Sequence, residues 1–387
     1  MDYYQRAIEI KEDIIKDRRY LHEHAEAGLC LPNTVEYVMK RLKEYGIESR
    51  RCGNGVVVEI GKGGKVILLR ADMDALPIKE DSGEEFSCSN GNMHACGHDF
   101  HATMLLNAAR LLKENEEELN GTVRLMFQTG EEIFKGCNDM LEAGVLDNVD
   151  AALAYHVCAG KMPVGLYMYN DKSTMMHSVD GFKITINGKG CHGAYPQDGI
   201  DPINIGVHIH LALQELIARE ANPSCSSVLT IGKFSAGNAA NIIPDSAVLE
   251  GTIRTNNLKE REMLVKRMKE VVNGVTSTYR GKVEIEMISE VPPLICNGDL
   301  TREMISYMED LKIPNARGVS DVQASASEDF AIIANKVPSA YFYLSAGYLD
   351  DRGEYPIHHP KVLFNEDVCT IGTAYYAQCA TMYLKNN

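Results

Sequence analysis

A thiol and several imidazoles lie within one short motif of the 387-residue chain. The segment MHACGHDFH (residues 93–101) contains Cys96 and His98, with His94 and His101 beside them. Thiolate and imidazole are ligands that Zn²⁺ prefers in proteins. In an extended segment, Cys96 and His98 would face the same side and could bind one ion. We therefore expect a metal site here, and the alternative is a buried thiol beside surface histidines.

A cysteine nucleophile is the second chemistry that this motif could support. Residues 99–113 predict a helix, so Cys96 would lie near its start, where the pKa of a thiol is lowered. We favour metal ligation, because Glu and His residues follow several strand-like segments. A metal centre needs such donors, whereas a thiol nucleophile does not.

Acidic and imidazole side chains follow three apolar segments that predict strands. KVILLR precedes Asp72 and Asp74, VRLMFQ precedes Glu131 and Glu132, and VDAALAY precedes His156. In an open α/β sheet, ligands bind beyond the carboxyl ends of the strands. We expect these side chains to converge on one crevice.

The paired glutamates indicate two different roles. Adjacent side chains at the end of a strand leave in opposite directions, so only one of Glu131 and Glu132 is expected to join the metal donors. The other can act as a general base towards a water molecule.

His358, in the motif YPIHHP, is a candidate for the same cluster although it is distant in sequence. One Cys, one Glu and three His are too many donors for one tetrahedral ion with an open position, and they suit two divalent ions such as Zn²⁺ or Mn²⁺.

A third group of candidates lies in the middle of the chain. The segment GKGCHGAYPQDGIDP (residues 188–202) carries His192 on a predicted loop. Asn241 precedes an Ile-Ile-Pro sequence, and Arg254 lies at the end of a predicted strand. An arginine suits a substrate carboxylate, which it binds through two parallel hydrogen bonds. An ordinary turn is the alternative for the glycine-rich segment.

Hydrophobic periodicity predicts an α/β chain around these motifs. Continuous apolar runs, typical of strands covered on both faces, alternate with helical segments such as residues 99–113. This alternation favours a mixed, largely parallel sheet. The runs are residues 56–60, 66–69, 123–127, 151–154 and 339–346.

The period of the apolar residues changes near residue 179. From there the pattern is strand, helix (201–219), strand, strand, helix (257–273) and strand, which predicts a split βαβ sandwich of ferredoxin-like type. We therefore predict a discontinuous α/β domain of residues 1–178 and 291–387, interrupted by an inserted α+β domain of residues 179–290.

Composition and charge argue against several classes of partner. Lys and Arg total 39 against 54 Asp and Glu, a formal net charge of −15, so binding to nucleic acid or to anionic membranes is not expected. No apolar run reaches the roughly 18 residues of a membrane span. The eleven cysteines include no CxxC pair, which disfavours a disulfide framework and indicates a reducing cytoplasm.

Taken together, the motifs resemble those of a known family. RADMDALPI, MHACGHDFH, FQTGEE, NIIPDSAVLEGTIRT and IHHP look like the motifs of the amidohydrolase family that holds bacterial aminoacylases, hippurate hydrolases and plant auxin-conjugate hydrolases. The match extends from about residue 21 to residue 365. The resemblance implies a dinuclear metallohydrolase of carboxypeptidase-like fold. Its implied reaction is cleavage of the amide bond of an N-acyl amino acid, which releases a carboxylic acid and an amino acid.

The resemblance also implies roles for individual residues. Glu131 would be the general base, Asp74 the acid that orients the metal site, and His192 a lid-domain group that helps stabilise the oxyanion. The inserted domain would act as a lid and mediate a homodimer. The ligands of the two ions would be Cys96, His98, Glu132, His156 and His358.

Two departures from the family pattern concern the shape of the substrate pocket. HAEAG stands where HPELG is usual, and Ala326 precedes SEDF where glycine is frequent.

Three alternative functions stay open. An N-acetyldiaminopimelate deacetylase of lysine biosynthesis shares the motifs and is one alternative. A non-catalytic metal-binding protein is another, although a mere binder would need no base such as Glu131. A thiol-dependent enzyme is the third.

Overall fold

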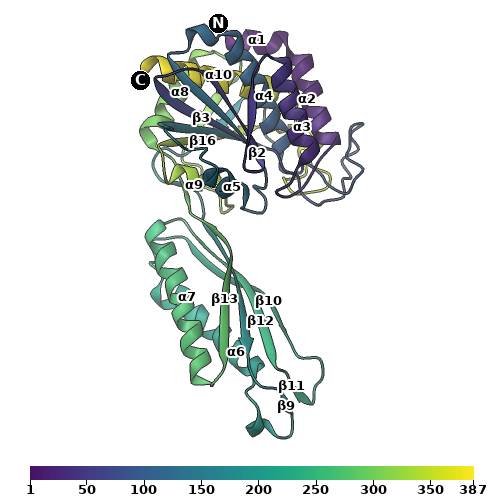
Figure 1. Ribbon diagram of the computed structural model, residues 1–387, viewed down its shortest axis with the longest axis vertical. Coiled ribbons are helices and arrows are strands. Elements are labelled where there is room, and N and C mark those ends of the chain that lie inside the picture. The colour runs from purple at the N-terminus through teal and green to yellow at the C-terminus, as the bar shows by residue number, and fades with distance from the viewer. The chain divides into compact units, whose positions relative to one another are not determined.

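The computed structural model describes residues 1–387, and the chain divides into two compact units. Unit 1 comprises residues 1–175, 295–322 and 332–387, and unit 2 comprises residues 176–294 and 323–331. Figure 1 labels the main helices and strands of both units in chain order. None of the helices combines the length and the apolar character needed to cross a membrane.

Unit 1 is built on a sheet of eight strands in the order β1-β2-β4-β3-β5-β16-β6-β15. The four neighbours β4, β3, β5 and β16 run parallel, whereas the β1–β2, β2–β4 and β16–β6 pairs are antiparallel. The predicted mixed sheet is confirmed, and its parallel part is the centre. The strands are β1 Ser49–Cys52, β2 Gly55–Gly61, β3 Lys65–Asp72, β4 Gly121–Gln128, β5 Ala151–Cys158, β6 Leu166–Met168, β15 Arg317–Val319 and β16 Ser339–Ser345.

Two helices of unit 1 are buried on nearly all sides. α4 (His98–Glu114) and α10 (Val368–Asn386) pack against each other and against the sheet, and α1 (Tyr3–Glu9) and α2 (Lys11–Glu23) cover them. This enclosure fits the sequences of α4 and α10, in which small and apolar residues occur on every face. The remaining helices outside the inserted segment are α3 Pro32–Glu44, α5 Gly136–Glu142, α8 Gly298–Asp310 and α9 Phe330–Ala334.

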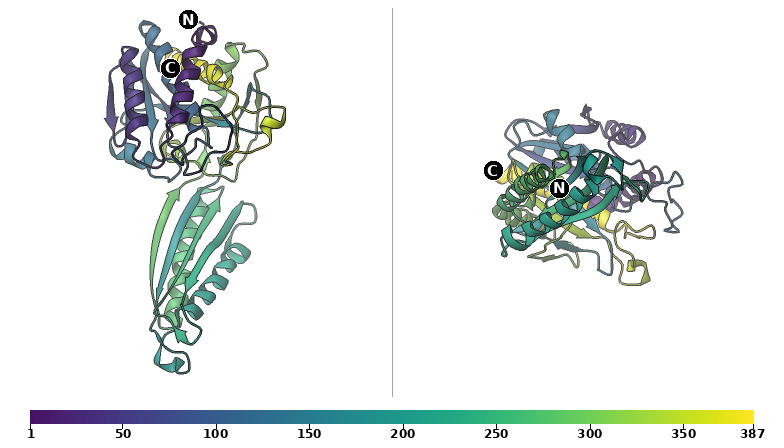
Figure 2. Two further views of the ribbon diagram at one scale, coloured as in Figure 1. Left: turned by 90° about the vertical axis from the view of Figure 1, so that its right-hand side faces the viewer. Right: turned by 90° about the horizontal axis from the view of Figure 1, so that it is seen from below.

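Unit 2 contains a four-stranded antiparallel sheet in the order β10-β12-β8-β13. Two helices cover one face of this sheet, as Figure 2 shows, and their apolar side chains form a separate core with it. The strand order and the element order along the chain are those of a split βαβ sandwich. The elements are β8 Val179–Asn187, α6 Pro202–Glu215, β10 Ser227–Ala236, β12 Ser246–Thr255, α7 Leu258–Thr278 and β13 Lys282–Val291.

Short elements complete the structure. β9 (Cys191–His192) pairs with β11 (Ile242–Ile243), and β7 (Thr174–Met176) pairs with β14 (Leu294–Ile295). Beyond α6, residues Leu216–Glu220 form a single π-helical turn, so the long helix predicted for 201–219 is continuous in direction but changes its hydrogen bonding near its end.

Candidate metal centre

The acidic and imidazole residues of unit 1 meet because three neighbouring strands are parallel. β4, β3 and β5 lie side by side, so their carboxyl ends are at the same edge of the sheet. Asp72 is the last residue of β3, and His156 lies near the end of β5. Glu131 and Glu132 follow β4 directly. The parallel order therefore brings these side chains to one place.

Five side chains of this edge form a continuous cluster of donor atoms. Cys96 Sγ lies 3.4 Å from His156 Nε2 and 3.2 Å from His358 Nε2. Glu132 Oε1 lies 3.5 Å from His358 Nε2 and 3.9 Å from His98 Nε2. The structure thus brings together all five residues that the resemblance marks as ligands, with Cys96 and Glu132 in the middle.

The segment around Cys96 is a turn, and the extended conformation expected for it is wrong. Gly97 has a φ of 85°, in the left-handed region, and His98 is already the first residue of α4. A Cβ atom at Gly97 would lie 2.3 Å from Val157 Cγ2, so glycine fits this position for a steric reason as well. The turn still delivers both side chains to one point, because donor atoms of Cys96, His98 and His156 lie within 4.8 Å of one another.

The two glutamates also lie on a turn, so the expected opposite directions of their side chains are wrong. β4 ends at Gln128, and the Phe134 N–H donates to the Glu131 carbonyl oxygen at 2.7 Å. The alternation of a strand therefore does not apply. Carboxylate oxygens of Glu131 and Glu132 and a ring nitrogen of His98 lie within 4.8 Å of one another. Both carboxylates face the same cluster.

Asp74 holds this turn through the backbone. Its carboxylate accepts from the Glu131 N–H at 3.0 Å and from the Glu132 N–H at 3.1 Å. The same carboxylate lies 3.4 Å from His98 Nδ1. Asp74 therefore orients both glutamates and one imidazole, which fits the orienting role that the resemblance implies.

Two histidines of the motif do not join the donor set. His101 uses both ring nitrogens, since Nδ1 lies 2.5 Å from Asp72 Oδ1 and Nε2 accepts from the Val157 N–H at 2.8 Å. His94 is 1% exposed, and burial lowers its pKa to about 4. Both rings are enclosed in unit 1, but only His101 is hydrogen-bonded to groups beside the cluster.

Burial dominates the electrostatics of the cluster. It raises the pKa of the Cys96 thiol well above its usual value, raises that of Glu132 and lowers that of His156. Burial alone would also lower the pKa of His98, but the negative charge of Asp72 and the contacts with Cys96 and Asp74 outweigh it and raise that pKa. A thiol nucleophile needs a lowered pKa, so these shifts argue against the thiol-dependent alternative.

The donor set fits divalent metal ions. Nδ1 of His98 faces the Asp74 carboxylate, whereas Oε1 of Glu132 is buried and has no hydrogen-bonding partner in the protein. His156 donates from Nδ1 to the Val157 carbonyl oxygen at 2.7 Å, which leaves Nε2 directed at Cys96. Metal-ligating histidines commonly donate their second N–H in this way. A thiol, three imidazoles and a carboxylate form a mixed set suited to Zn²⁺ or Mn²⁺.

The three candidates of unit 2 fall into two places. His192, in β9, pairs with Ile242, and the Gly193 N–H donates to the Asn241 carbonyl oxygen, so His192 and Asn241 are neighbours. They lie at the end of the sheet where β12 begins, at the tip of unit 2 seen in Figure 1. Arg254 lies at the other end of β12, and its Nη1 donates to Ser327 Oγ at 2.9 Å.

The separation within unit 2 is large compared with a small substrate. The eight steps from Ser246 to Arg254, at about 3.3 Å each, span roughly 26 Å. The structure therefore brings His192 and Asn241 together and keeps Arg254 away from them within one copy of the chain.

Arg70 is a supporting residue that the sequence analysis missed. It is 1% exposed, and its Nη1 donates to Asp72 Oδ2 at 2.6 Å. The sequence did contain a signal for Arg70: it lies inside the apolar run KVILLR, and a buried arginine almost always has a partner.

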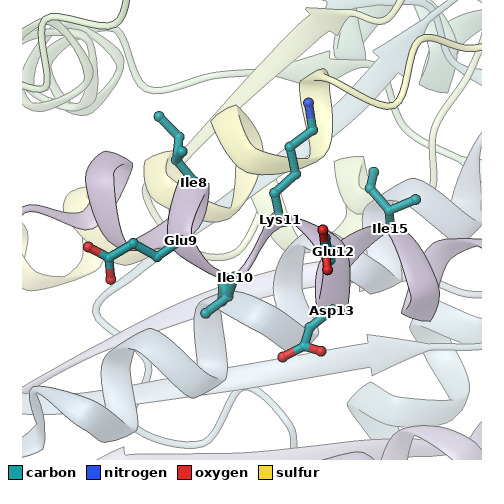
Figure 3. Close-up of a pocket in the computed structure, with 7 residues that line it drawn as sticks. All are labelled: Ile8, Glu9, Ile10, Lys11, Glu12, Asp13 and Ile15. Atoms are coloured by element: carbon teal, nitrogen blue, oxygen red, sulfur yellow. The ribbon is translucent and has the colours of Figure 1, made fainter.

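A surface depression elsewhere in unit 1, shown in Figure 3, contains no His or Cys. It is lined by Ile8, Glu9, Ile10, Lys11, Glu12, Asp13 and Ile15.

A mixed sheet with such a donor cluster beyond its parallel strands fits the class of metal-dependent hydrolases. Residues 68–382 match the sequence profile of Peptidase family M20/M25/M40. The chain therefore belongs to this family, and it is a metal-dependent amidohydrolase. The resemblance described from the motifs is confirmed.

Similar proteins support this assignment over the whole chain. N-acetyl-L-cysteine deacetylase of Bacillus subtilis (strain 168) is 34% identical over 387 residues, 98% of this chain and 90% of the relative. An IAA-amino acid hydrolase of Arabidopsis thaliana is 36% identical over 391 residues, 99% of this chain and 88% of the relative. A solved dinuclear metal-binding M20 peptidase of Bacillus subtilis has a TM-score of 0.81 and 32% identity, and the match covers 98% of this chain and 99% of that one.

Proposed function

We propose that the protein hydrolyses the amide bond of N-acyl amino acids and releases a carboxylic acid and a free amino acid. The observation that carries this proposal is the second carboxylate, Glu131, which lies beside the five donors and is held by Asp74. A protein that only binds metal would need no such group. The two relatives described above are named for an N-acetyl amino acid and for IAA-amino acids, which supports this substrate class.

The proposed cofactor is a pair of divalent ions, Zn²⁺ or Mn²⁺, held by the five clustered donors. When bound, such ions would polarise the acyl oxygen and lower the pKa of a bound water molecule to near neutrality. The proposed ligands are Cys96, His98, Glu132, His156 and His358.

The remaining steps belong to side chains of the chain itself. Glu131 accepts a proton from the attacking water and returns it to the leaving nitrogen, so one carboxylate serves both steps. His192 donates a hydrogen bond to the oxyanion of the tetrahedral intermediate. Arg254 binds the substrate carboxylate through two hydrogen bonds, and Asn241 contacts the substrate beside His192.

We also propose that the protein is a homodimer in which His192 of the partner subunit completes each active site. The separation of roughly 26 Å along β12 supports this, because one small substrate cannot contact both Arg254 and His192 of the same copy. The surface proposed for dimer formation is the exposed apolar stripe of α6 beside the unpaired edge strand β10. The stripe consists of Ile203, Val207 and Leu211, which are 38%, 44% and 59% exposed.

In this proposal residues 179–290 are the inserted lid and dimerisation domain, and residues 1–178 and 291–387 are the catalytic domain. The exposed tip that carries His192 supports a role outside its own subunit. We propose neither nucleic acid nor a membrane as a partner, and we propose the cytoplasm as the location.

A panel of substrates tests the proposed function. N-acetyl, N-benzoyl and long-chain N-acyl amino acids and N-acetyldiaminopimelate are each incubated with Mn²⁺ or Zn²⁺, with and without a chelator. We expect cleavage of several acyl amino acids that the chelator abolishes. Cleavage of N-acetyldiaminopimelate alone would assign the protein to lysine biosynthesis, and no cleavage despite bound metal would leave only a binding protein.

Cys96→Ser tests the metal centre directly. We expect the variant to lose metal affinity by more than the roughly 10- to 100-fold that removal of a supporting residue costs, because a serine hydroxyl stays protonated where a thiol ionises. Metal content after gel filtration measures the effect. Cys379→Ser is the matched control, because this thiol is also fully buried but bonds to Tyr155 Oη and to the Met304 carbonyl oxygen. Equal metal content in both variants would remove Cys96 from the ligands.

A further inference from the structure

The pairing of strand β5 with its neighbour β3 ends before either strand does, and before β5 reaches the metal centre. The pairing of the two strands ends at Arg70 and Ala154, whereas β5 continues to Cys158. Beyond Ala154, the backbone N–H groups on that side of β5 therefore have no ladder partner on β3. Because this part of the sheet is buried, each of them needs another acceptor.

Two side chains take the place of the lost pairing with β3. Tyr376 Oη accepts from the Tyr155 N–H at 3.2 Å, and His101 Nε2 accepts from the Val157 N–H at 2.8 Å. The proposed ligand His156 lies between these two residues. β16 pairs with the other side of β5 as far as Cys158, so on the side facing β3 the strand is held around His156 by side chains from two different helices.

We propose that His101 is a positioning residue that holds His156 in its ligating orientation through the backbone of Val157. The inference rests on the proposed metal site, because it assigns a role to a residue that supports a proposed ligand. His101 itself has no lone pair left for a metal ion. Its Nε2 accepts from Val157, so Nδ1 carries the proton and donates to Asp72.

The hydrogen bonds form a continuous chain between Asp72 and the ligand, in which His156 is the first donor and Asp72 the final acceptor. Arg70 Nη1 donates to Asp72 Oδ2 at 2.6 Å, and Asp72 Oδ1 accepts from His101. His101 accepts from the N–H of Val157, and the carbonyl oxygen of Val157 accepts from His156 Nδ1 at 2.7 Å. The N–H of Val157 is therefore bound by His101, and the carbonyl oxygen of Val157 binds the His156 ring. This fixes the tautomer that leaves His156 Nε2 facing Cys96, 3.4 Å away.

Two substitutions separate the two halves of the His101 contact. His101→Gln places an oxygen near the position of Nε2, where it can accept from Val157, but loses the donor to Asp72. His101→Asn places an amide N–H near the position of Nδ1, where it can donate to Asp72, but does not reach Val157. We expect His101→Asn to lose metal affinity by about 10- to 100-fold. We expect His101→Gln to bind metal with an affinity close to that of the unchanged protein.

The readouts are the equilibrium affinity for Zn²⁺ and the visible absorption spectrum of the Co²⁺-loaded protein, which reports the geometry of the ligands. Tyr376→Phe is the matched control, since it removes the acceptor for the Tyr155 N–H and the donor to the Arg70 carbonyl oxygen but leaves the contacts of His101 intact. We expect it to lower thermal stability without changing the affinity or the spectrum. The inference is overturned if His101→Asn binds metal normally, or if His101→Gln or Tyr376→Phe loses as much affinity as His101→Asn.

A reference variant distinguishes failure of this inference from failure of the proposed site. If His156→Ala binds metal like the unchanged protein, His156 is not a ligand and the site itself is wrong. If His156→Ala loses metal and His101→Asn does not, only the role of His101 is wrong. Should His101→Asn not fold, the ¹⁵N shifts of the histidines in the unchanged protein decide. A neutral His101 ring protonated on Nδ1 supports the inference, and a proton on Nε2 overturns it.

Discussion

Glu131→Gln is expected to lower kcat by about 10²- to 10⁴-fold while the protein keeps its metal. Glutamine has nearly the shape of glutamate, and the backbone N–H of residue 131 would still donate to Asp74. An amide, however, cannot accept the proton of the attacking water. The measurements are kcat with an N-acyl amino acid and metal content by elemental analysis. Retained turnover would remove Glu131 as the general base.

The neighbouring glutamate provides the matched control for this result. Glu132→Gln is the same chemical change one residue further on, but Glu132 Oε1 lies 3.5 Å from His358 Nε2 and is a proposed ligand. We expect Glu132→Gln to lose metal, whereas Glu131→Gln loses turnover only. The opposite pattern would exchange the roles of the two glutamates.

His192→Ala is expected to lower kcat by about 10²- to 10³-fold, the usual effect of removing one donor to an oxyanion. The substitution should leave the fold intact, because the His192 side chain is exposed and β9 is held to β11 by backbone pairing. Kinetics of the purified variant measure the loss. A fall in kcat with little change in KM would match an interaction made mainly in the transition state.

Mixed dimers test whether His192 serves the partner subunit. Subunits with Glu131→Gln are combined with subunits carrying His192→Ala, and each variant alone is almost inactive. If the histidine acts across the dimer, each hybrid has one intact site with Glu131 from one subunit and His192 from the other, so activity returns. If both residues act within one subunit, no hybrid site is intact and activity stays absent. Leu211→Glu, placed in the exposed stripe of α6, should prevent both dimer formation and this recovery.

Much of the fold followed from local sequence patterns. The apolar run at residues 123–127 predicted β4, and the segment SAVLEGTIRT predicted a strand at the position of β12, Ser246–Thr255. Such predictions succeed because burial on both faces, or on one, leaves a period in the chain itself. The direction of a strand leaves no such period. β2 is as apolar as β3, yet it runs antiparallel to its neighbours because of how the chain connects them.

For the candidate site, the sequence by itself determined the donor types and their place after the strands. Tertiary structure alone decided that Cys96 and the glutamates lie on turns, which depends on the close approach of Val157 to Gly97 and on the carboxylate of Asp74. It also decided that His101 holds the backbone and that His192 lies far from Arg254. The physical reason is that donor chemistry belongs to each side chain, whereas its partners come from segments distant in sequence and exist only once those segments have packed.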